Sequence, residues 1–228
     1  MTVDIRKYKE IQQIKVAVDC IIFGFNDNRL ELLLIHRGFQ PEKGKWSLIG
    51  EFIGNDEDLD DAANRVLYGL SGLENIYMEQ VKTFGKANRD SSGRVISTTY
   101  SAMILKSQYN EEHVNKYNAK WFPIDNLPEL VFDHRDMVDS AIKRLRRRVR
   151  NFPIAFNLLP EKFTLPQLQA LYEGILNEPI DKRNFRRKVA QMKYLVKLSE
   201  KDMSESKKGA YYYYFDEALY EIEQNFNL

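Results

Sequence analysis

The chain has 228 residues, of which 43% are hydrophobic and 29% charged, so it is long enough for two domains and has the composition of a soluble globular protein. No apolar run approaches the ~20 residues of a membrane helix, the first twenty residues lack the apolar core of a signal peptide, and a single cysteine excludes an internal disulfide framework. We therefore expect a cytoplasmic protein with no membrane partner, whose net charge of +1 excludes a uniformly basic or acidic chain.

The first half of the chain alternates strand and helix patterns. Two apolar runs, 15–25 and 30–38, predict strands joined by the turn-rich NDNR, and the Gly and Pro content of 38–46 predicts a loop. Residues 56–72 predict a helix, because acids crowd its first turn, apolar residues recur at helical spacing and Gly72 can end it.

Three more strands and a closing helix follow. The strands are predicted at 74–86, 93–105 and 118–124, and the helix at 135–149, where Val138, Ala141 or Ile142, Leu145 and Val149 share one face. A proline-containing stretch then separates this part from the rest. We place one domain at residues 1–152 and a second at 153–228.

The predicted helix at 56–72 carries a degenerate motif. Its end, RVLYGLSGL, resembles the close of the Nudix box, G-x5-E-x7-R-E-U-x-E-E-x-G-U, where U is aliphatic. Anchoring the box on Gly72 places its first Glu on Glu57 and its Arg on Arg65. The segments LLLIHRGFQPEKGKWSLIGEF and AKWFPIDNLPELVFDHRDMVDSAIKRL also resemble that family. The resemblance implies a Nudix-like α/β/α sandwich with a mixed sheet over about residues 12–150.

The chemistry implied by the family does not carry over with the fold. Nudix hydrolases hold magnesium through box glutamates, and those positions are Val66, Gly69 and Leu70 here. Mg²⁺ requires oxygen ligands, so we expect no catalytic residues, no metal site, no cofactor and no hydrolase activity. Arg65, which has lost its partner in the box, either pairs with another carboxylate such as Glu51 or Asp56, or lines a ligand pocket.

The C-terminal third has its own pattern. Thr164 and Gln167 form a capping box for one helix, and Asp181 can cap a second helix from Lys182 to about Met192. Two strand-like segments, 194–200 and 210–215, flank a basic loop, and alternate tyrosines of the second should face the core. This order resembles a winged helix-turn-helix domain, whose second helix enters the major groove of double-stranded DNA.

Basic residues concentrate where that resemblance expects DNA contacts. Residues 182–208 hold ten basic residues against three acidic ones. The candidate DNA-binding residues are Lys182, Arg183, Asn184, Arg186, Arg187, Gln191, Ser206, Lys207 and Lys208. The alternative is a merely solvated basic face. A second cluster, KRLRRRVR at 143–150, either touches phosphates or coats a helix that links the domains.

A Nudix domain without its acids, followed by a winged helix, resembles the Nudix-related transcriptional regulators. Segments such as FNLLPEKFTLPQLQALYE and DKRNFRRKVAQM resemble the sugar-sensing, arabinose-responsive branch of Bacteroidetes. This implies a homodimeric repressor of carbohydrate genes on a near-palindromic operator, released by L-arabinose or a related pentose. The alternatives are an ADP-ribose-sensing regulator of NAD metabolism, a residual Nudix hydrolase and a protein-interaction adaptor.

A pentose needs planar hydrogen-bonding groups and one apolar face. The candidate effector-binding residues are Asp19, His36, Arg37, Lys45, Trp46, Ser47, Glu51, Arg65, Asn88 and Arg89. Asp19 stands out because it is a carboxylate inside an apolar strand, where it needs a partner. A purely structural role is the alternative for each residue, with Trp46 in the core and Asp19 paired to Lys45.

Overall fold

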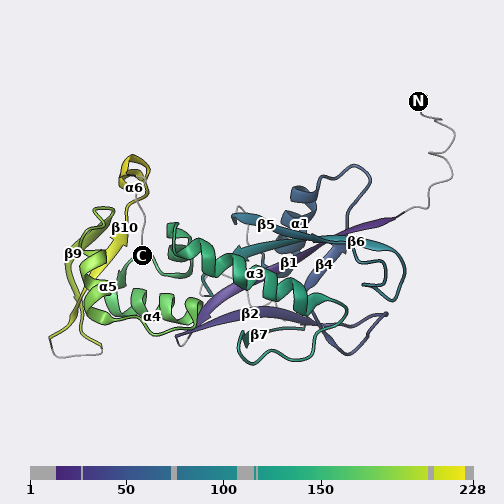
Figure 1. Cartoon of the computed structure of the whole chain (residues 1–228), viewed down its shortest axis with the longest axis horizontal. Helices are drawn as coiled ribbons and strands as arrows, with labels where there is room; N and C mark the ends of the chain where they lie inside the picture. The colour runs from purple at the N-terminus through teal and green to yellow at the C-terminus, as the bar shows by residue number, and fades with distance from the viewer. Residues whose placement is uncertain are drawn as a thin grey trace.

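The computed structural model describes residues 14–26, 28–72, 76–106, 116, 118–204 and 208–223. These form two parts that lie side by side along the long axis of the molecule (Figure 1). The N-terminal part is built on a large mixed sheet, and the C-terminal part combines short helices with a small sheet. No helix in the described ranges is both long and apolar enough to cross a membrane.

The large sheet has seven strands. They are β1 (Lys15–Asn26), β2 (Arg29–His36), β3 (Trp46–Ser47), β4 (Ile49–Phe52), β5 (Met78–Phe84), β6 (Val95–Met103) and β7 (Ala119–Pro123). The order is β3-β2-β1-β6-β5, with β4 added beside β1 and β7 beside β2. β1 and β6 are parallel and the other pairs antiparallel, which confirms the predicted mixed sheet. The predicted loop at 38–46 was too long, since its last residue already pairs with β2.

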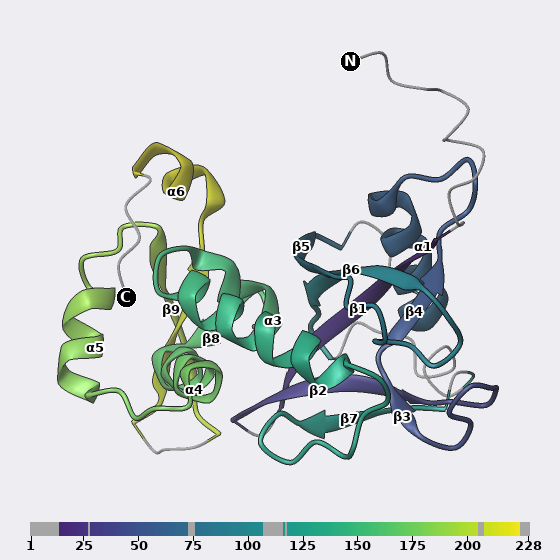
Figure 2. The ribbon, with the colours of Figure 1, turned by 45° about the vertical axis from the view of Figure 1, so that its right-hand side comes forward.

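One helix covers each face of this sheet, as a Nudix-like sandwich requires (Figure 2). α1 (Leu59–Ser71) packs against one face through Ala62, Ala63, Val66 and Leu67. α3 (His134–Val149) packs against the other through Val138, Ala141, Ile142, Leu145 and Val149, the face that the periodicity predicts. Gly72 ends α1 in the left-handed conformation, with φ of 68°.

The C-terminal part has the winged-helix arrangement. It comprises the 3-10 helix η2 (Pro153–Leu158), β8 (Phe163–Thr164), α4 (Leu165–Leu176), α5 (Lys182–Val189), β9 (Leu195–Asp202), β10 (Ala210–Phe215) and α6 (Glu217–Glu223). Thr164 and Gln167 form the predicted capping box on α4, and Asp181 caps α5. β8, β10 and β9 make an antiparallel sheet. α6 was not predicted from the sequence.

Two local details differ from the sequence expectations. α5 ends at Val189 and not near Met192, because the amides of Gln191 and Met192 bond three residues back instead of four and tighten the last turn. In β10 a register shift between Tyr211 and Tyr213 interrupts the strict alternation expected of the tyrosine run.

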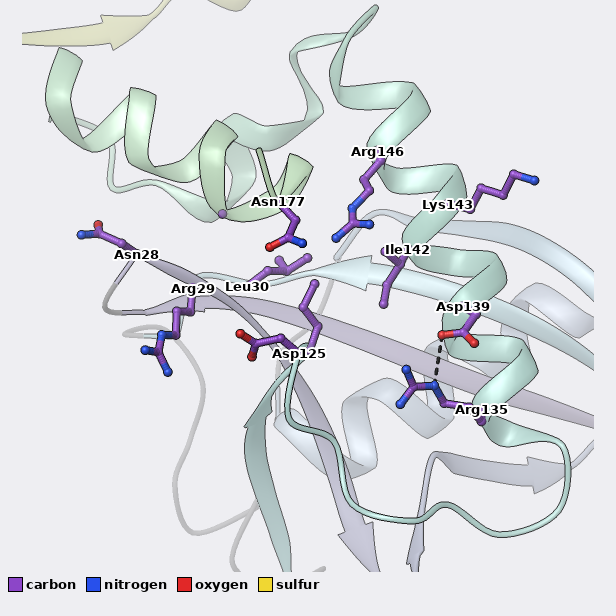
Figure 3. A pocket seen from close by; sticks show the side chains of 12 residues that line it. Asn28, Arg29, Leu30, Asp125, Arg135, Asp139, Ile142, Lys143, Arg146 and Asn177 are labelled. Carbon is purple, nitrogen blue, oxygen red and sulfur yellow. Dashed lines mark hydrogen bonds and ion pairs between the residues drawn. The ribbon is translucent and has the colours of Figure 1, made fainter. Parts of the chain in front are cut away.

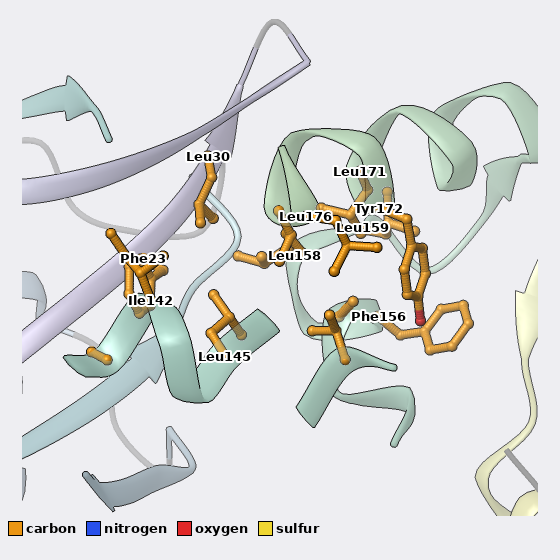
Figure 4. Packing of buried hydrophobic residues seen from close by; sticks show 14 of the residues in the cluster. Phe23, Leu30, Ile142, Leu145, Phe156, Leu158, Leu159, Leu171, Tyr172 and Leu176 are labelled. Atoms are coloured by element: carbon orange, nitrogen blue, oxygen red, sulfur yellow. The ribbon is translucent and has the colours of Figure 1, made fainter. Parts of the chain in front are cut away.

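The two parts share one hydrophobic core at their junction. Figure 4 shows its residues: Phe23 and Leu30 come from the large sheet, Ile142 and Leu145 from α3, and Phe156, Leu158, Leu159, Leu171, Tyr172 and Leu176 from the C-terminal part. All of these side chains are buried. The interface is therefore packed like a domain interior, so α3 and the winged helix domain are mechanically connected.

Candidate effector pocket and DNA interface

A cavity of about 400 Å³ opens on the large sheet beside the first residues of β1, along β4 and at the start of α3. Its lining comprises Ala17, Asp19, Arg37, Phe39, Gln40, Pro41, Ser47, Leu48, Gly50, Glu51, Phe52, Arg89, Asp90, Ser92, Val95, Phe132 and His134. This volume lies within the range of small-molecule sites, and the mixture of apolar walls with a few convergent charges is typical of them. We refer to it as the effector pocket.

The floor of the effector pocket is a buried charge network. The Arg89 guanidinium donates to both carboxylate oxygens of Asp133, the helix N-cap of α3, over 2.7 to 3.1 Å. Its Nη2 also lies 3.6 Å from Oδ2 of Asp19, which accepts a 2.6 Å hydrogen bond from the Ser97 hydroxyl. The Arg89 side chain is only 3% exposed, so these carboxylates hold the cation inside the protein.

One carboxylate oxygen of Asp19, Oδ1, differs from the other in its contacts. Within the described residues no hydrogen bond to its Oδ1 is formed, and the nearest polar side-chain atom paired with it is Nε2 of His134 at 3.7 Å. Gly50 lies directly opposite on β4, and a Cβ there would come within 2.2 Å of Oδ1. Only glycine therefore fits at position 50, and its lack of a side chain leaves the carboxylate facing the pocket.

His134 is fixed in one orientation beside this carboxylate. Its Nδ1 accepts a 3.1 Å hydrogen bond from the backbone N–H of Leu48, so in the neutral ring the proton is on Nε2. Burial lowers the pKa of His134, and Arg89 lowers it further, against the opposing effect of Asp19. The imidazole is therefore a neutral donor directed toward Asp19.

The mouth of the pocket combines a cation with aromatic rings. The Arg37 guanidinium lies 4.4 Å from the ring centre of Phe39 and 5.4 Å from that of Phe132. Its Nε donates to the carbonyl of Pro41 over 2.9 Å. These contacts hold Arg37 over the opening, where it can meet an anionic group while the rings offer an apolar face.

Arg65 pairs with two carboxylates, Glu51 and Glu57. It donates to Glu57 over 2.7 and 2.9 Å, and it contacts Glu51 as well. The hydrogen bonds from Arg65, and then that from the Gly54 amide, lower the pKa of Glu57 to about 2. Pairing with Glu51 was predicted, whereas Asp56 is not the second partner.

The structure brings together five of the ten candidate effector residues, namely Asp19, Arg37, Ser47, Glu51 and Arg89. The other five, His36, Lys45, Trp46, Arg65 and Asn88, do not line the cavity. The alternative pairing of Asp19 with Lys45 was wrong, since the exposed Lys45 ammonium lies 2.6 Å from Glu42. Trp46 packs edge-on between His36 and Phe122 beside the core, which agrees with the purely structural role that was its alternative.

The pocket residues that the sequence did not indicate include its three phenylalanines and its histidine, namely Phe39, Phe52, Phe132 and His134. His134 and Phe132 lie on the segment VFDHRDM, whose histidine was the available signal because it directly precedes the predicted helix at 135–149. Its proximity to Asp19, 115 positions earlier in the chain, needs the tertiary structure.

The three positions at which the Nudix box has glutamates carry no carboxylate in this chain. Val66 is buried in the core beneath α1, and Gly69 has no side chain, while the Leu70 side chain lies outside the described part. In the ranges that the structure describes, no group of three His, Cys, Asp or Glu side chains is arranged to hold a metal ion.

The second candidate site is the exposed face of α5. Phe185 and Val189 are buried against the domain, whereas the candidate DNA-binding residues of the helix all lie on its solvent side. These are Lys182, Arg183, Asn184, Arg186 and Arg187, and Gln191 just beyond the helix is exposed as well. The Arg187 guanidinium donates to the Asn184 side-chain oxygen over 3.2 Å, which orients both groups on one surface.

The hairpin of β9 and β10 supplies the wing. Lys208 is exposed near its tip, whereas Ser206 and Lys207 lie outside the described residues. Tyr211 is 39% exposed and lies beneath the ammonium groups of Lys197 and Lys201, at 3.6 and 4.6 Å from its ring centre. Tyr213 and Phe215 pack against the core, which agrees with the predicted role of the tyrosine run in strand packing.

The basic cluster at 143–150 is used within the protein. Arg144 and Arg148 both pair with Glu79 of β5. Arg146 donates to the carbonyl of Ile175, and Arg150 pairs with Glu178 over 2.7 Å. Four of its six basic side chains therefore tie α3 to the elements on either side, which favours the linking role over phosphate contact.

Comparisons with known proteins match both parts of the chain. Residues 13–141 match the NUDIX domain family, and residues 155–215 match the NrtR DNA-binding winged helix domain. The chain is 32% identical to a protein of Acinetobacter baylyi described as an ADPR-responsive transcriptional repressor, over 92% of this chain and 85% of that one. It is also 31% identical to an ADP-ribose pyrophosphatase of Methanocaldococcus jannaschii, over 61% of this chain and 80% of the relative.

Solved structures agree with these matches. NrtR of Shewanella oneidensis, determined in complex with a 27-mer DNA, is 29% identical with a TM-score of 0.80, and the match covers 93% of this chain and 97% of that one. Its NUDIX domain, determined with ADP-ribose, is 27% identical with a TM-score of 0.51, over 63% of this chain and 99% of that one. The chain thus belongs to the Nudix family, among the members that carry an NrtR-type winged helix, and it is a DNA-binding transcriptional regulator.

Proposed function

We propose that the protein is a repressor whose effector pocket binds ADP-ribose or a close ribosyl relative, and that the bound ligand weakens its hold on DNA. The observation that carries this proposal is the joint match to the A. baylyi repressor, which extends over nearly the whole chain and includes both domains. The same comparisons do not support the arabinose and carbohydrate-metabolism expectation. The ADP-ribose alternative therefore takes its place.

The pocket chemistry supports a ribosyl ligand. The Oδ1 of Asp19 can accept a hydrogen bond from a ribose hydroxyl. This bond favours ligand binding, because a buried carboxylate oxygen without a hydrogen bond is costly. Arg37 at the mouth provides a charge for a phosphate, and Phe39 and Phe132 provide apolar faces. A neutral pentose would use Asp19 and leave Arg37 without an anionic partner.

We propose further that the Nudix domain has no pyrophosphohydrolase activity. Val66 and Gly69 supply no side-chain oxygen where the family holds magnesium. Glu51 and Glu57 are engaged by Arg65, so neither is a free ligand. Incubation with ADP-ribose and Mg²⁺ should give no turnover, and turnover that disappears in Glu57→Gln would establish a displaced catalytic site instead.

On DNA we propose a homodimer that places two copies of α5 in the major grooves of a near-palindromic operator. Recognition helices need half-sites separated by one helical turn or a multiple of it, and a two-fold dimer supplies that spacing. Sequencing the genomic fragments retained by the purified protein at moderate salt would give the operator. A sedimentation measurement on the complex would give the stoichiometry.

The effector proposal is tested by fluorescence anisotropy on the recovered operator. ADP-ribose should weaken DNA binding by about 5- to 150-fold, the usual range of allosteric coupling, with ribose 5-phosphate, ribose and L-arabinose as comparison ligands. Arg37→Ala should lose most of this response while binding DNA as before. A response to L-arabinose with none to ADP-ribose would identify the pentose as the effector. Failure to enrich any DNA sequence would contradict the proposed operator binding.

A further inference from the structure

A second cavity, of about 490 Å³, lies at the junction of the two domains and shares no lining residue with the effector pocket. Its walls come from the β1–β2 turn and the end of β7 in the Nudix domain, from α3, and from the end of α4 in the winged helix domain. Figure 3 shows these elements converging around it. We refer to it as the junction cleft.

The junction cleft has an apolar floor and a polar rim. Leu30, Ile124 and Ile142 give the apolar surface. Figure 3 shows the Arg146 guanidinium and the Asn177 amide on one side of the cleft, with the Asp125 carboxylate across from them, while Lys143 extends away. Sites for small molecules commonly have this design, and they are frequent at domain interfaces.

Arg146 is held in place and still has donors to give. Its Nε donates to the carbonyl of Ile175 over 2.8 Å, which fixes the plane of the guanidinium. Its terminal Nη atoms make no other hydrogen bond or ion pair within the described residues. Asn177 has φ of 56° at the end of α4, a conformation that places its amide beside Arg146, as Figure 3 shows.

The charges of the rim favour an anion. Arg135 and Asp139 neutralise each other over 3.1 Å. This leaves Arg29, Lys143 and Arg146 against Asp125 among the lining residues. A guanidinium and an amide together donate to a phosphate or carboxylate, and a carboxylate accepts from hydroxyl groups.

We propose that the junction cleft is a second ligand site, which takes a small hydroxylated organic anion of the sugar phosphate or sugar acid class. Arg146 and Asn177 hold the anionic group, Asp125 accepts a hydroxyl, and Leu30 and Ile142 cover one face of the carbon skeleton. This site is separate from the effector pocket and does not depend on the ligand assigned to that pocket.

A ligand in this cleft bridges the two domains. Next to it, Gly174 of α4 approaches the β1–β2 turn so closely that a Cβ would lie 2.8 Å from the Phe25 ring and 2.9 Å from the Asn28 carbonyl. The junction cleft is therefore an opening in a contact between α4 and the large sheet that is tightly packed beside it. A bound ligand stabilises this relative placement of α4 and the sheet. Any DNA affinity that depends on the same placement is then coupled to the ligand, and each changes the affinity for the other by the same factor.

The test is titration calorimetry on the full chain with four probes: ribose 5-phosphate, gluconate, ribose and inorganic phosphate. Ribose 5-phosphate or gluconate should bind with a Kd below about 1 mM, and ribose and phosphate should bind at least about tenfold more weakly, because each has only half of the recognised groups. The stronger of the two anions distinguishes a phosphate from a carboxylate as the recognised group.

Matched variants locate the binding. Asn177→Asp puts a negative charge beside Arg146 in a residue that tolerates the left-handed conformation, and it should weaken binding at least about tenfold. Asn177→Gly keeps the backbone conformation, removes only the amide, and should weaken binding less. Lys86→Met, at an exposed position that lines neither cavity, should leave the affinity for these probes unchanged, and thermal unfolding of each variant checks that it is folded.

Any of the following results would overturn the proposal. They are binding that Asn177→Asp does not change, binding that disappears in Arg37→Ala, and no heat from either anion up to about 1 mM. Inorganic phosphate that binds as tightly as ribose 5-phosphate would also count against it, because the hydroxyl contact to Asp125 would then contribute nothing.

Discussion

The effector pocket and helix α5 use charged residues in opposite ways. The charges on the floor of the pocket are buried, paired and contributed by segments far apart in the chain, as Arg89, Asp133 and Asp19 are. The charges of α5 are adjacent in the sequence, exposed, and largely free to meet a partner. Changes in the pocket should therefore reduce stability as well as binding, whereas changes on α5 should affect DNA binding alone.

The largest effect that tests this difference is expected for Arg89→Met. Removing the guanidinium leaves two carboxylates buried near each other, and breaking a buried ion pair costs about 3–5 kcal/mol. Urea denaturation should show a loss of this size. Lys86→Met is the matched control, because its side chain is 76% exposed and lies 3.7 Å from Asp136, so the change should stay within about 0.5 kcal/mol. Equal effects of the two variants would contradict the buried network.

Substitution of α5 should give the reverse result. Arg187→Ala should leave the unfolding free energy unchanged and weaken specific DNA binding by about 1–3 kcal/mol, provided that it contacts a base edge. Lys208→Ala on the wing is the comparison. It should weaken all DNA sequences alike and reduce the slope of log affinity against log salt by about 0.9. Retention of full affinity by both variants would show that α5 and the wing do not form the DNA interface.

The smallest effect concerns pH and His134. Because burial lowers its pKa, the unfolded chain takes up a proton that the folded chain does not when the pH falls below about 6.5. The free energy of unfolding should therefore decrease with falling pH, by up to about 1.4 kcal/mol per pH unit. Asp19, Asp133, Arg89 and Arg37 are the charged groups that act on this histidine.

Two glutamine variants sharpen the pH prediction. His134→Gln can still accept from the Leu48 amide but cannot take up a proton, so denaturation curves between pH 5.5 and 7.5 should lose most of this dependence. His36→Gln, at an exposed position beside Trp46, should keep it. A dependence that survives in His134→Gln would assign the titration to other groups.

Local sequence signals predicted the elements well, for identifiable physical reasons. The capping box at Thr164 and Gln167 is a contact between residues three positions apart, so its pattern specifies its own geometry. The buried face of α3 follows from helical periodicity in the same way. The degenerate Nudix box on α1 was likewise recognisable from the spacing of its residues alone, and the comparisons confirm the Nudix domain that it indicated.

The pocket depended on contacts that no local pattern contains. Asp19 was recognised as a carboxylate in need of a partner, yet its partners Ser97, Arg89 and His134 come from three distant segments, brought together when β1 pairs with β6 and α3 closes over the sheet. Lys45 and Trp46 precede the pocket strand β4 closely in sequence, but strand alternation and a turn direct them elsewhere.

The sequence by itself determined the two domains, their class and the exposed basic helix α5, because periodicity, caps and charge runs act over a few residues. The tertiary structure alone decided which acids and bases share a cavity, and it revealed the junction cleft, whose walls combine β2, α3 and the end of α4. Long-range packing sets these neighbours, and packing depends on how whole elements fit together, which local spacing does not encode.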